Sequence, residues 1–168
     1  MSRSEAWSRS RRMSFVIIMC ALSSALALFT IPIGFTSLHV TQFPIILTGL
    51  IAGPWTGSMV GLLGTIVMAY RLTPPNPYIV FGNAMLGFFT GLLYSNLKKI
   101  RTRLIVPQVL STLGAYAIQS PYVYLTDVYL AGIPSQVVLT ILLPSLLVED
   151  IICVLFSHLV IYRMKLDG

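Results

Sequence analysis

The chain has 168 residues, of which 56% are hydrophobic and only 10% are charged. An ordinary soluble domain carries about 25% charged residues, so this chain has too few charges to cover a water-exposed surface. The composition therefore excludes a water-soluble monomer. It also excludes intrinsic disorder, which requires low hydrophobicity and high net charge.

The uncharged tracts have room for about six membrane-spanning helices, since each span needs about 20 predominantly apolar residues. Residues 13–70 and 72–97 contain no Asp, Glu, Lys or Arg, and residues 104–162 contain only three such residues. The apolar runs are continuous, whereas the strands of a membrane β-barrel would alternate between apolar and polar residues. The sequence therefore predicts an all-α membrane protein.

Three basic clusters predict the orientation of these helices. They are the N-terminal segment 1–12, the loop 98–103, and Arg163 with Lys165 after the last apolar tract. Short loops rich in Lys and Arg remain in the cytoplasm, so an even number of crossings must separate the clusters. We therefore expect a single integral membrane domain over residues 1–168, with six helices and both termini cytoplasmic.

The expected helices follow one another with short connections. The second is short, and Gly53–Pro54 separates it from the third, because glycine and proline end one helix and proline is well placed to start the next. The expected ranges, in chain order, are 13–32, 41–52, 54–70, 77–96, 104–129 and 135–162.

Small residues at four-residue spacing recur in the third and fourth helices. Gly57 and Gly61 lie on the third, and Gly87 and Gly91 lie on the fourth. Small residues allow membrane helices to approach backbone to backbone. We interpret these glycines as packing positions inside the bundle.

The first helix carries a similar pattern on two adjacent faces. Ala21 and Ala25 lie on one face, and Ser23 and Ala27 lie on the next. Such faces either pack within the bundle or bind another membrane protein, and the spacing alone leaves both alternatives open.

Ionisable residues inside the spans are the strongest functional candidates, because burying them in a bilayer is costly. Glu149 and Asp150 lie near the middle of the sixth span. Neighbouring helical residues differ by about 100°, so at most one of them points directly into a shared cavity. A structural role in hydrogen bonding between helices is the alternative for each. No phosphate-binding loop is present, so any ATP-driven work requires a separate ATPase.

Aromatic and polar residues also gather towards the expected outer half of the bundle. Aromatic walls with a few polar groups are typical of a small-molecule pocket. The alternatives are an interfacial belt for the tyrosines and contact with lipid phosphate for Arg71. The candidate binding residues are Arg71, Asn83, Tyr116, Gln119, Tyr124, Asp127 and Glu149.

One stretch of the sequence resembles a known family. Pro44-x-x-Leu47-x-Gly49-x-x-x-Gly53-Pro54-x-x-Gly57 is similar to a motif in the substrate-binding S components of energy-coupling-factor (ECF) transporters, which import vitamins. The turn Phe81-Gly82-Asn83-Ala84-x-x-Gly87 and the small residues of the first helix are also similar. The length and the six expected helices agree with the family over nearly the whole chain.

The resemblance implies a multi-pass subunit of the plasma membrane that binds a vitamin-sized molecule on the extracellular side. It implies no enzymatic activity and no cofactor in this chain. A transmembrane coupling subunit and two cytoplasmic ATPases would use ATP to drive uptake, and no nucleic acid would be involved. In the family, the first helix contacts the coupling subunit. The resemblance therefore implies that the candidate contact residues of this chain are Ala21, Ala25, Ser23 and Ala27.

The substrate itself stays open at this stage. Three acidic groups and one cation in the candidate region favour a neutral or cationic aromatic vitamin, such as a riboflavin-like or thiamin-like molecule. Two other functions remain as alternatives: a membrane scaffold of the MreD type, without a ligand pocket, and an intramembrane enzyme. The enzyme is the weakest alternative, because no paired catalytic groups lie at matched depth.

Overall fold

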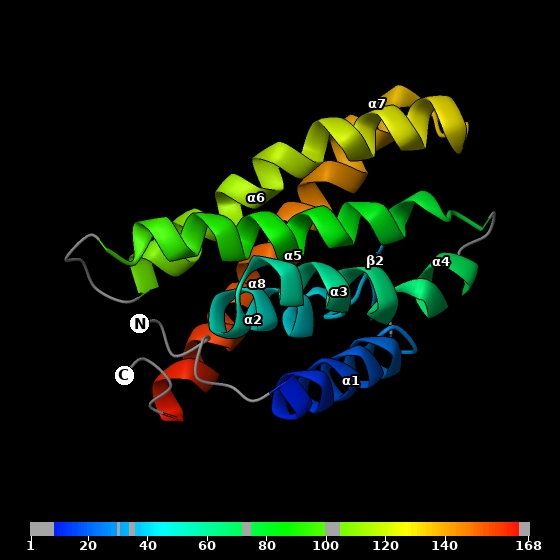
Figure 1. The fold of residues 1–168 in the computed structure, drawn as a ribbon. Coiled ribbons are helices and arrows are strands. Elements are labelled where there is room, and N and C mark those ends of the chain that lie inside the picture. The colour runs from blue at the N-terminus through cyan, green and yellow to red at the C-terminus, as the bar shows by residue number, and fades with distance from the viewer. Residues whose placement is uncertain (1–8, 30, 34–35, 72–74, 100–104, 165–168) are drawn as a thin grey trace.

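The structure is a computed structural model that describes residues 9–29, 31–33, 36–71, 75–99 and 105–164. These residues form a helical bundle with one short antiparallel hairpin, in which Pro32 pairs with Ser37 (Figure 1). The elements in chain order are α1 (Arg9–Leu26), β1 (Ile31–Ile33), β2 (Thr36–Leu38), α2 (Gln42–Ala52), α3 (Pro54–Gly64), α4 (Ile66–Arg71), α5 (Tyr78–Leu97), α6 (Ile105–Leu125), the π-helix η2 (Thr126–Leu130), α7 (Ser135–Val137), the π-helix η3 (Val138–Leu142) and α8 (Leu143–Arg163).

The helical architecture is the predicted one, with two local corrections. The first helix ends at Leu26 and not at residue 32, and the hairpin follows it. A residue that precedes proline disfavours helical backbone angles, which explains why Ile31, before Pro32, is extended. The third predicted helix is divided at Thr65 into α3 and α4.

Helix α5 lies in the middle of the bundle. It packs against α2 and α3 on one side and against α6 on the other (Figure 1). Helix α8 contacts both α6 and α2 and so joins the two sides of the bundle. The core includes Ile46, Leu86 and Val154.

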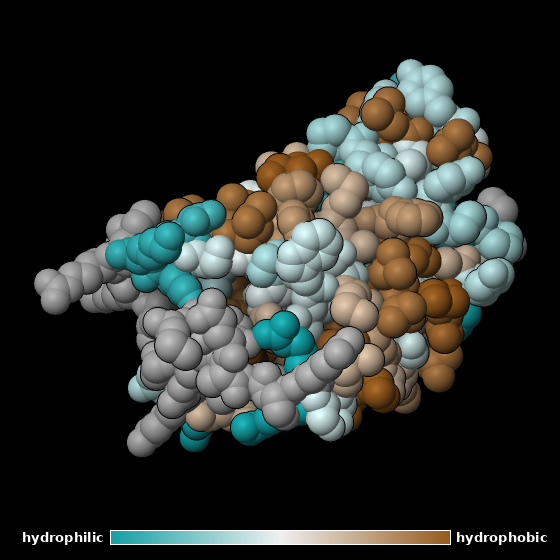
Figure 2. Space-filling view, in the orientation of Figure 1, coloured by the Kyte–Doolittle hydropathy of each residue, from teal (hydrophilic) through white to brown (hydrophobic). Residues whose placement is uncertain are grey.

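The described residues contain two helices that are long and apolar enough to cross a membrane individually, Tyr78–Leu97 and Ser135–Arg163. Helix α2 is also apolar but shorter. Large apolar side chains are also exposed on the exterior, including those of Ile17, Trp55 and Leu159. Figure 2 shows hydrophobic residues over much of one face. An apolar exterior of this extent is suited to lipid contact. The number of crossings and the cytoplasmic placement of the termini stay predictions.

The predicted break at Gly53–Pro54 is confirmed. Gly53 ends α2 with a backbone φ of 91°, which residues other than glycine rarely adopt. Pro54 then starts α3. The turn places α3 beside α2, so that both helices face α5.

Glycines at this interface bring helix backbones into direct contact. A Cβ atom added to Gly57 would lie 2.6 Å from the carbonyl oxygen of Gly87, and one added to Gly91 would lie 2.6 Å from the backbone nitrogen of Pro54. A Cβ at Gly61 would collide with the carbonyl group of Asn83. The interpretation of these glycines as internal packing positions is therefore confirmed.

We predict that Gly61→Ala destabilises the bundle by about 1–3 kcal/mol, the usual cost of inserting atoms into a filled core. The obstructing group is backbone, which cannot move aside without shifting α5. Thermal unfolding in detergent measures the change. Gly114→Ala is the matched control, because its Cβ would meet only the Cδ1 atom of Leu93, a movable side chain. Equal midpoints for the two variants would contradict the prediction.

Candidate functional site

A cavity of about 220 Å³ lies at one end of the bundle, lined by α5, α6, α8 and the segment leading into α2. Its apolar lining includes Met68, Ile79, Val123, Ile133, Leu142 and Leu146. Its polar lining comprises His39, Gln42, Asn76, Tyr78, Asn83, Gln119, Tyr122, Thr126, Asp127, Ser145 and Glu149. An apolar cavity with a limited set of converging polar groups is typical of a site for a small organic molecule.

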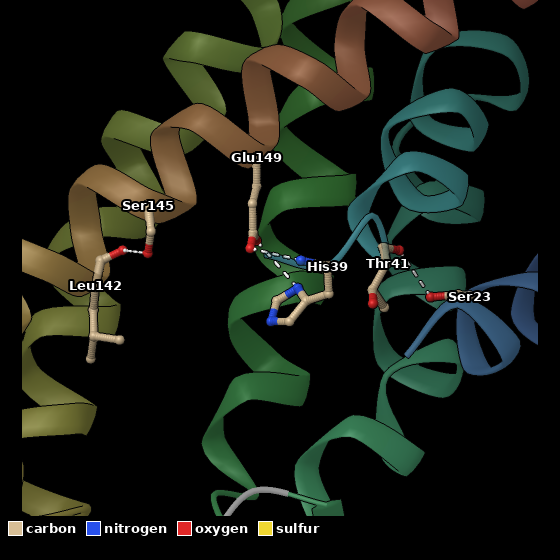
Figure 3. Close-up of polar contacts among 6 residues, drawn as sticks. All are labelled: Ser23, His39, Thr41, Leu142, Ser145 and Glu149. Atoms are coloured by element: carbon tan, nitrogen blue, oxygen red, sulfur yellow. Dashed lines mark hydrogen bonds and ion pairs between the residues drawn. The ribbon is translucent and has the colours of Figure 1, made fainter. Parts of the chain in front are cut away.

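Glu149 connects α8 to the chain segment between β2 and α2. Its Oε1 accepts a hydrogen bond of 3.1 Å from the backbone N–H of His39 (Figure 3). Its Oε2 lies 3.3 Å from Nδ1 of the same histidine, but the two atoms are not aligned as a hydrogen bond. Burial lowers the pKa of the His39 imidazole, more than the hydrogen bond of its backbone raises it. At neutral pH this contact therefore joins a neutral ring to the carboxyl group.

Asp127 connects the end of α6 to the segment between α4 and α5. Its Oδ1 accepts a 2.7 Å hydrogen bond from the side-chain amide of Asn76. The amide oxygen of Asn76 in turn accepts a bond from the backbone N–H of Tyr78, at the start of α5. Asp127 lies in the π-helical segment η2, and such segments often occur at functional sites.

Two amide side chains line the cavity between α5 and α6. Asn83 and Gln119 are both buried, and both border the cavity. A Cβ on Gly82 would lie only 3.3 Å from the Nε2 atom of Gln119, so the glycine leaves room for this amide. Each amide offers both a donor and an acceptor to a bound molecule.

Four of the seven candidate binding residues from the sequence line the cavity: Asn83, Gln119, Asp127 and Glu149. The other three do not. The Tyr116 hydroxyl donates to the carbonyl oxygen of Leu143 at 2.8 Å, and the Arg71 guanidinium donates to the carbonyl oxygen of Ala27. Tyr124 is half-buried on α6 but is not part of the lining. Arg71 therefore lies outside the cavity lining, with its side chain bonded to the end of α1, and its role in ligand binding stays a prediction.

The sequence reasoning missed several lining residues. Tyr122 was detectable, since it lies one helical turn from Gln119, and its hydroxyl donates to the carbonyl oxygen of Tyr78 at 3.1 Å. Gln42 was also detectable, since it is a polar residue at the start of the expected helix 41–52. His39 and Asn76 carried no such signal, because both lie in connections between helices.

The two neighbouring carboxyl groups of α8 have different surroundings. Glu149 lines the cavity, whereas Asp150 is fully buried outside it, and neither oxygen of Asp150 has a hydrogen-bond partner. This agrees with the expectation that only one of the two faces a shared cavity. Among the described residues, no three His, Cys, Asp or Glu side chains come together as metal ligands.

The small residues of α1 are also divided between two environments. Ser23 and Ala27 are buried within the bundle, and the Ser23 hydroxyl donates to the carbonyl oxygen of Thr41 at 3.1 Å (Figure 3). Ala21 and Ala25 are exposed on the outer face. Ser23 and Ala27 are therefore packing positions of this bundle, and only Ala21 and Ala25 remain available to a partner.

Comparison with protein families identifies the chain. The model of the ECF-type riboflavin transporter S-component family matches residues 8–165, nearly the whole sequence. The chain belongs to this family. A solved S component of a bacterial ECF transporter has the same fold, with a TM-score of 0.73 and 20% sequence identity, over 94% of this chain and 97% of that chain. Comparison with curated protein sequences gives no match.

Membership of this family confirms the resemblance seen in the sequence. S components are integral membrane proteins that bind the substrate of an ECF transporter, and they are not a family of enzymes. The alternative of an MreD-type scaffold receives no support.

Proposed function

We propose that this S component captures riboflavin or a closely related heteroaromatic vitamin in the cavity beside Asn83, Gln119 and Glu149. The family match supports the ligand class, and the lining supports the position. The apolar walls suit a planar ring, and the two amides suit the nitrogen and oxygen atoms at its edge. The carboxyl groups of Glu149 and Asp127 suit the hydroxyl groups of a sugar-alcohol chain.

The ligand would enter from the extracellular side. Under the predicted orientation, the basic loop 98–103 is cytoplasmic and the opposite end of the bundle, which contains the cavity, is outside. A transmembrane coupling subunit and two cytoplasmic ATPases would then supply the energy for release into the cell. The outer face of α1, with Ala21 and Ala25, is the proposed contact with the coupling subunit.

Calorimetric titration of the purified protein in detergent tests the position of the ligand. We expect riboflavin to bind the wild type, and Asn83→Ala to weaken binding roughly 2- to 12-fold, because a net hydrogen bond contributes about 0.5–1.5 kcal/mol. Tyr116→Phe is the control, since its hydroxyl bonds to backbone away from the cavity. Unchanged affinity in Asn83→Ala, or a larger loss in Tyr116→Phe, would show that the ligand lies elsewhere.

Cysteine labelling in intact cells tests the orientation. After replacement of Cys20 and Cys153 by serine, we expect a membrane-impermeant thiol reagent to label Arg71→Cys and Pro75→Cys but not Lys99→Cys. Lys99 belongs to a basic cluster, which the positive-inside rule places in the cytoplasm. Labelling of Lys99→Cys with protection of both outer positions would reverse the orientation.

Uptake measurements test the contact with the coupling subunit. We expect Ala21→Trp and Ala25→Trp to abolish uptake while they leave ligand affinity unchanged, because a bulky ring separates closely packed helices. Leu22→Trp is the matched control on α1, because this position already carries a large, exposed side chain. Uptake at the wild-type rate in both alanine variants would place the coupling surface on another helix.

A further inference from the structure

A second hollow lies on the side of the bundle and is bordered by α3, α5 and α6. Helix α5 lies between the other two and packs against both (Figure 1). The hollow has a volume of about 460 Å³, and we call it the side groove. Its lining includes Ser58 and Leu62 from α3, Phe81, Met85 and Phe88 from α5, and Tyr122 from α6. Most of these side chains are apolar, so the side groove suits an apolar occupant.

The side groove is continuous with the apolar exterior of the bundle. Phe81 and Leu62 of its lining are exposed, and so are Trp55 and Met59 on the same helix as Leu62. The Trp55 ring meets the Phe88 ring edge to face, with 5.2 Å between the ring centroids. S components are integral membrane proteins, so an apolar surface of this kind is suited to the hydrocarbon of the bilayer. The molecules next to the side groove are therefore lipids.

The walls of the side groove favour a flexible chain over another helix. Membrane helices associate where small residues let their backbones approach. In this part of the bundle, Gly57, Gly61 and Gly87 are already closed against the backbones of neighbouring helices. The side groove instead presents large side chains, such as those of Phe81 and Phe88. A methylene chain can lie between such side chains and gain many small dispersion contacts.

The length of the side groove agrees with the thickness of one leaflet. From Phe81 to Phe89 it follows α5 for about 12 Å, at a rise of about 1.5 Å per residue. Half of a hydrocarbon core of about 30 Å is about 15 Å. Under the predicted orientation, the start of α5 is extracellular, so the chain in the groove would belong to the outer leaflet.

We propose that the side groove binds an acyl chain of a membrane phospholipid, and that this chain supports Tyr122 as a wall of the ligand cavity. Tyr122 lines both the groove and the cavity. Its hydroxyl donates to the carbonyl oxygen of Tyr78, and a Cβ on Gly82 would lie 3.5 Å from its ring. The ring therefore separates the two hollows. The second part of the proposal rests on the proposed function, because it concerns the ligand of the cavity.

The physical basis of this link is packing. A side chain with open space on one side lacks dispersion contacts there, and an occupant of that space supplies them. An acyl chain in the side groove would hold the Tyr122 ring against Gly82 and restrict the motion of the cavity wall. A wall that is already ordered reduces the cost of ordering on ligand binding. By linkage, the bound ligand would raise the affinity for the acyl chain by the same factor.

Quenching of Trp55 fluorescence tests the acyl-chain site. Replacement of Trp7 by phenylalanine leaves Trp55 as the only tryptophan of the sequence. The purified protein in detergent, without riboflavin, is titrated with a phosphatidylglycerol whose acyl chains are brominated, because bromine quenches a nearby tryptophan. We expect the quenching to saturate, as it does at a defined site. Quenching that rises without saturation would indicate general contact with lipid and would overturn the acyl-chain site.

Three variants of α3 locate the bound chain. We expect Ser58→Phe and Leu62→Phe, which add volume within the side groove, to weaken the saturable binding at least about fivefold, or about 1 kcal/mol. Met59→Phe is the matched control, because this position already carries a large exposed side chain outside the lining. Where one filling variant does not fold, the other decides. Wild-type lipid affinity in a folded filling variant, or an equal loss in Met59→Phe, would place the chain elsewhere and overturn the site.

Crosslinking in native membranes tests for a protein in the side groove. A photoreactive thiol reagent is attached to Phe81→Cys after replacement of Cys20 and Cys153 by serine. We expect it to react with lipid and to leave the protein at its monomeric mass. Crosslinks to a second copy of the chain or to another membrane protein would place a helix in the groove and overturn the acyl-chain site.

Calorimetric titration with riboflavin tests the link through Tyr122. We expect saturating, unbrominated phosphatidylglycerol to tighten riboflavin binding to the wild type at least about threefold, and to have no effect on the binding to Ser58→Phe. Equal affinity of the wild type with and without lipid would overturn the link but leave the acyl-chain site and the proposed function intact. If riboflavin binds in neither condition, the proposed ligand and the link both fail, whereas the acyl-chain site is decided by the fluorescence titration.

Discussion

The direct backbone contact of α5 with α2 and α3 is the constraint on which the rest of the bundle depends. Glycines at Gly57, Gly61 and Gly87 remove the side chains that would hold these helices apart. The contact at Gly61 is with the carbonyl group of Asn83, a residue that lines the cavity. Close packing therefore determines where this amide lies. The neighbouring Gly82 leaves space for the amide of Gln119.

The cavity also depends on chain segments that lie between helices. His39 holds Glu149 through its backbone N–H, and Asn76 holds Asp127 through its side chain. Each carboxyl group is thus oriented by a connection and not by a neighbouring helix. Hydrogen bonds to acidic groups are stronger in a low-dielectric interior than in water. These two contacts accordingly join the connections to α8 and η2 and hold both acidic groups at the cavity wall.

The sequence predicted the helices and the Gly53–Pro54 break because apolar length, glycine and proline act locally. It also predicted Asn83, Gln119, Asp127 and Glu149, since polar residues in apolar spans are costly and therefore conspicuous. It did not predict His39 or Asn76, because their positions result from the segment after the hairpin and from the loop before α5. The position of Arg71 outside the cavity lining has a similar cause: its partner, the carbonyl oxygen of Ala27, is a backbone group that no residue pattern reveals.

The cavity and the proposed contact with the coupling subunit occupy separate parts of the bundle. Among the described residues, no α1 side chain lines the cavity, while Ser23 and Ala27 attach the inner face of α1 to the bundle. The outer face of α1 therefore lies apart from the proposed ligand site. Substitutions at cavity positions such as Glu149 can therefore alter which molecule is bound without altering the proposed docking face at Ala21 and Ala25. In this arrangement, a single coupling surface is compatible with cavities of different chemistry.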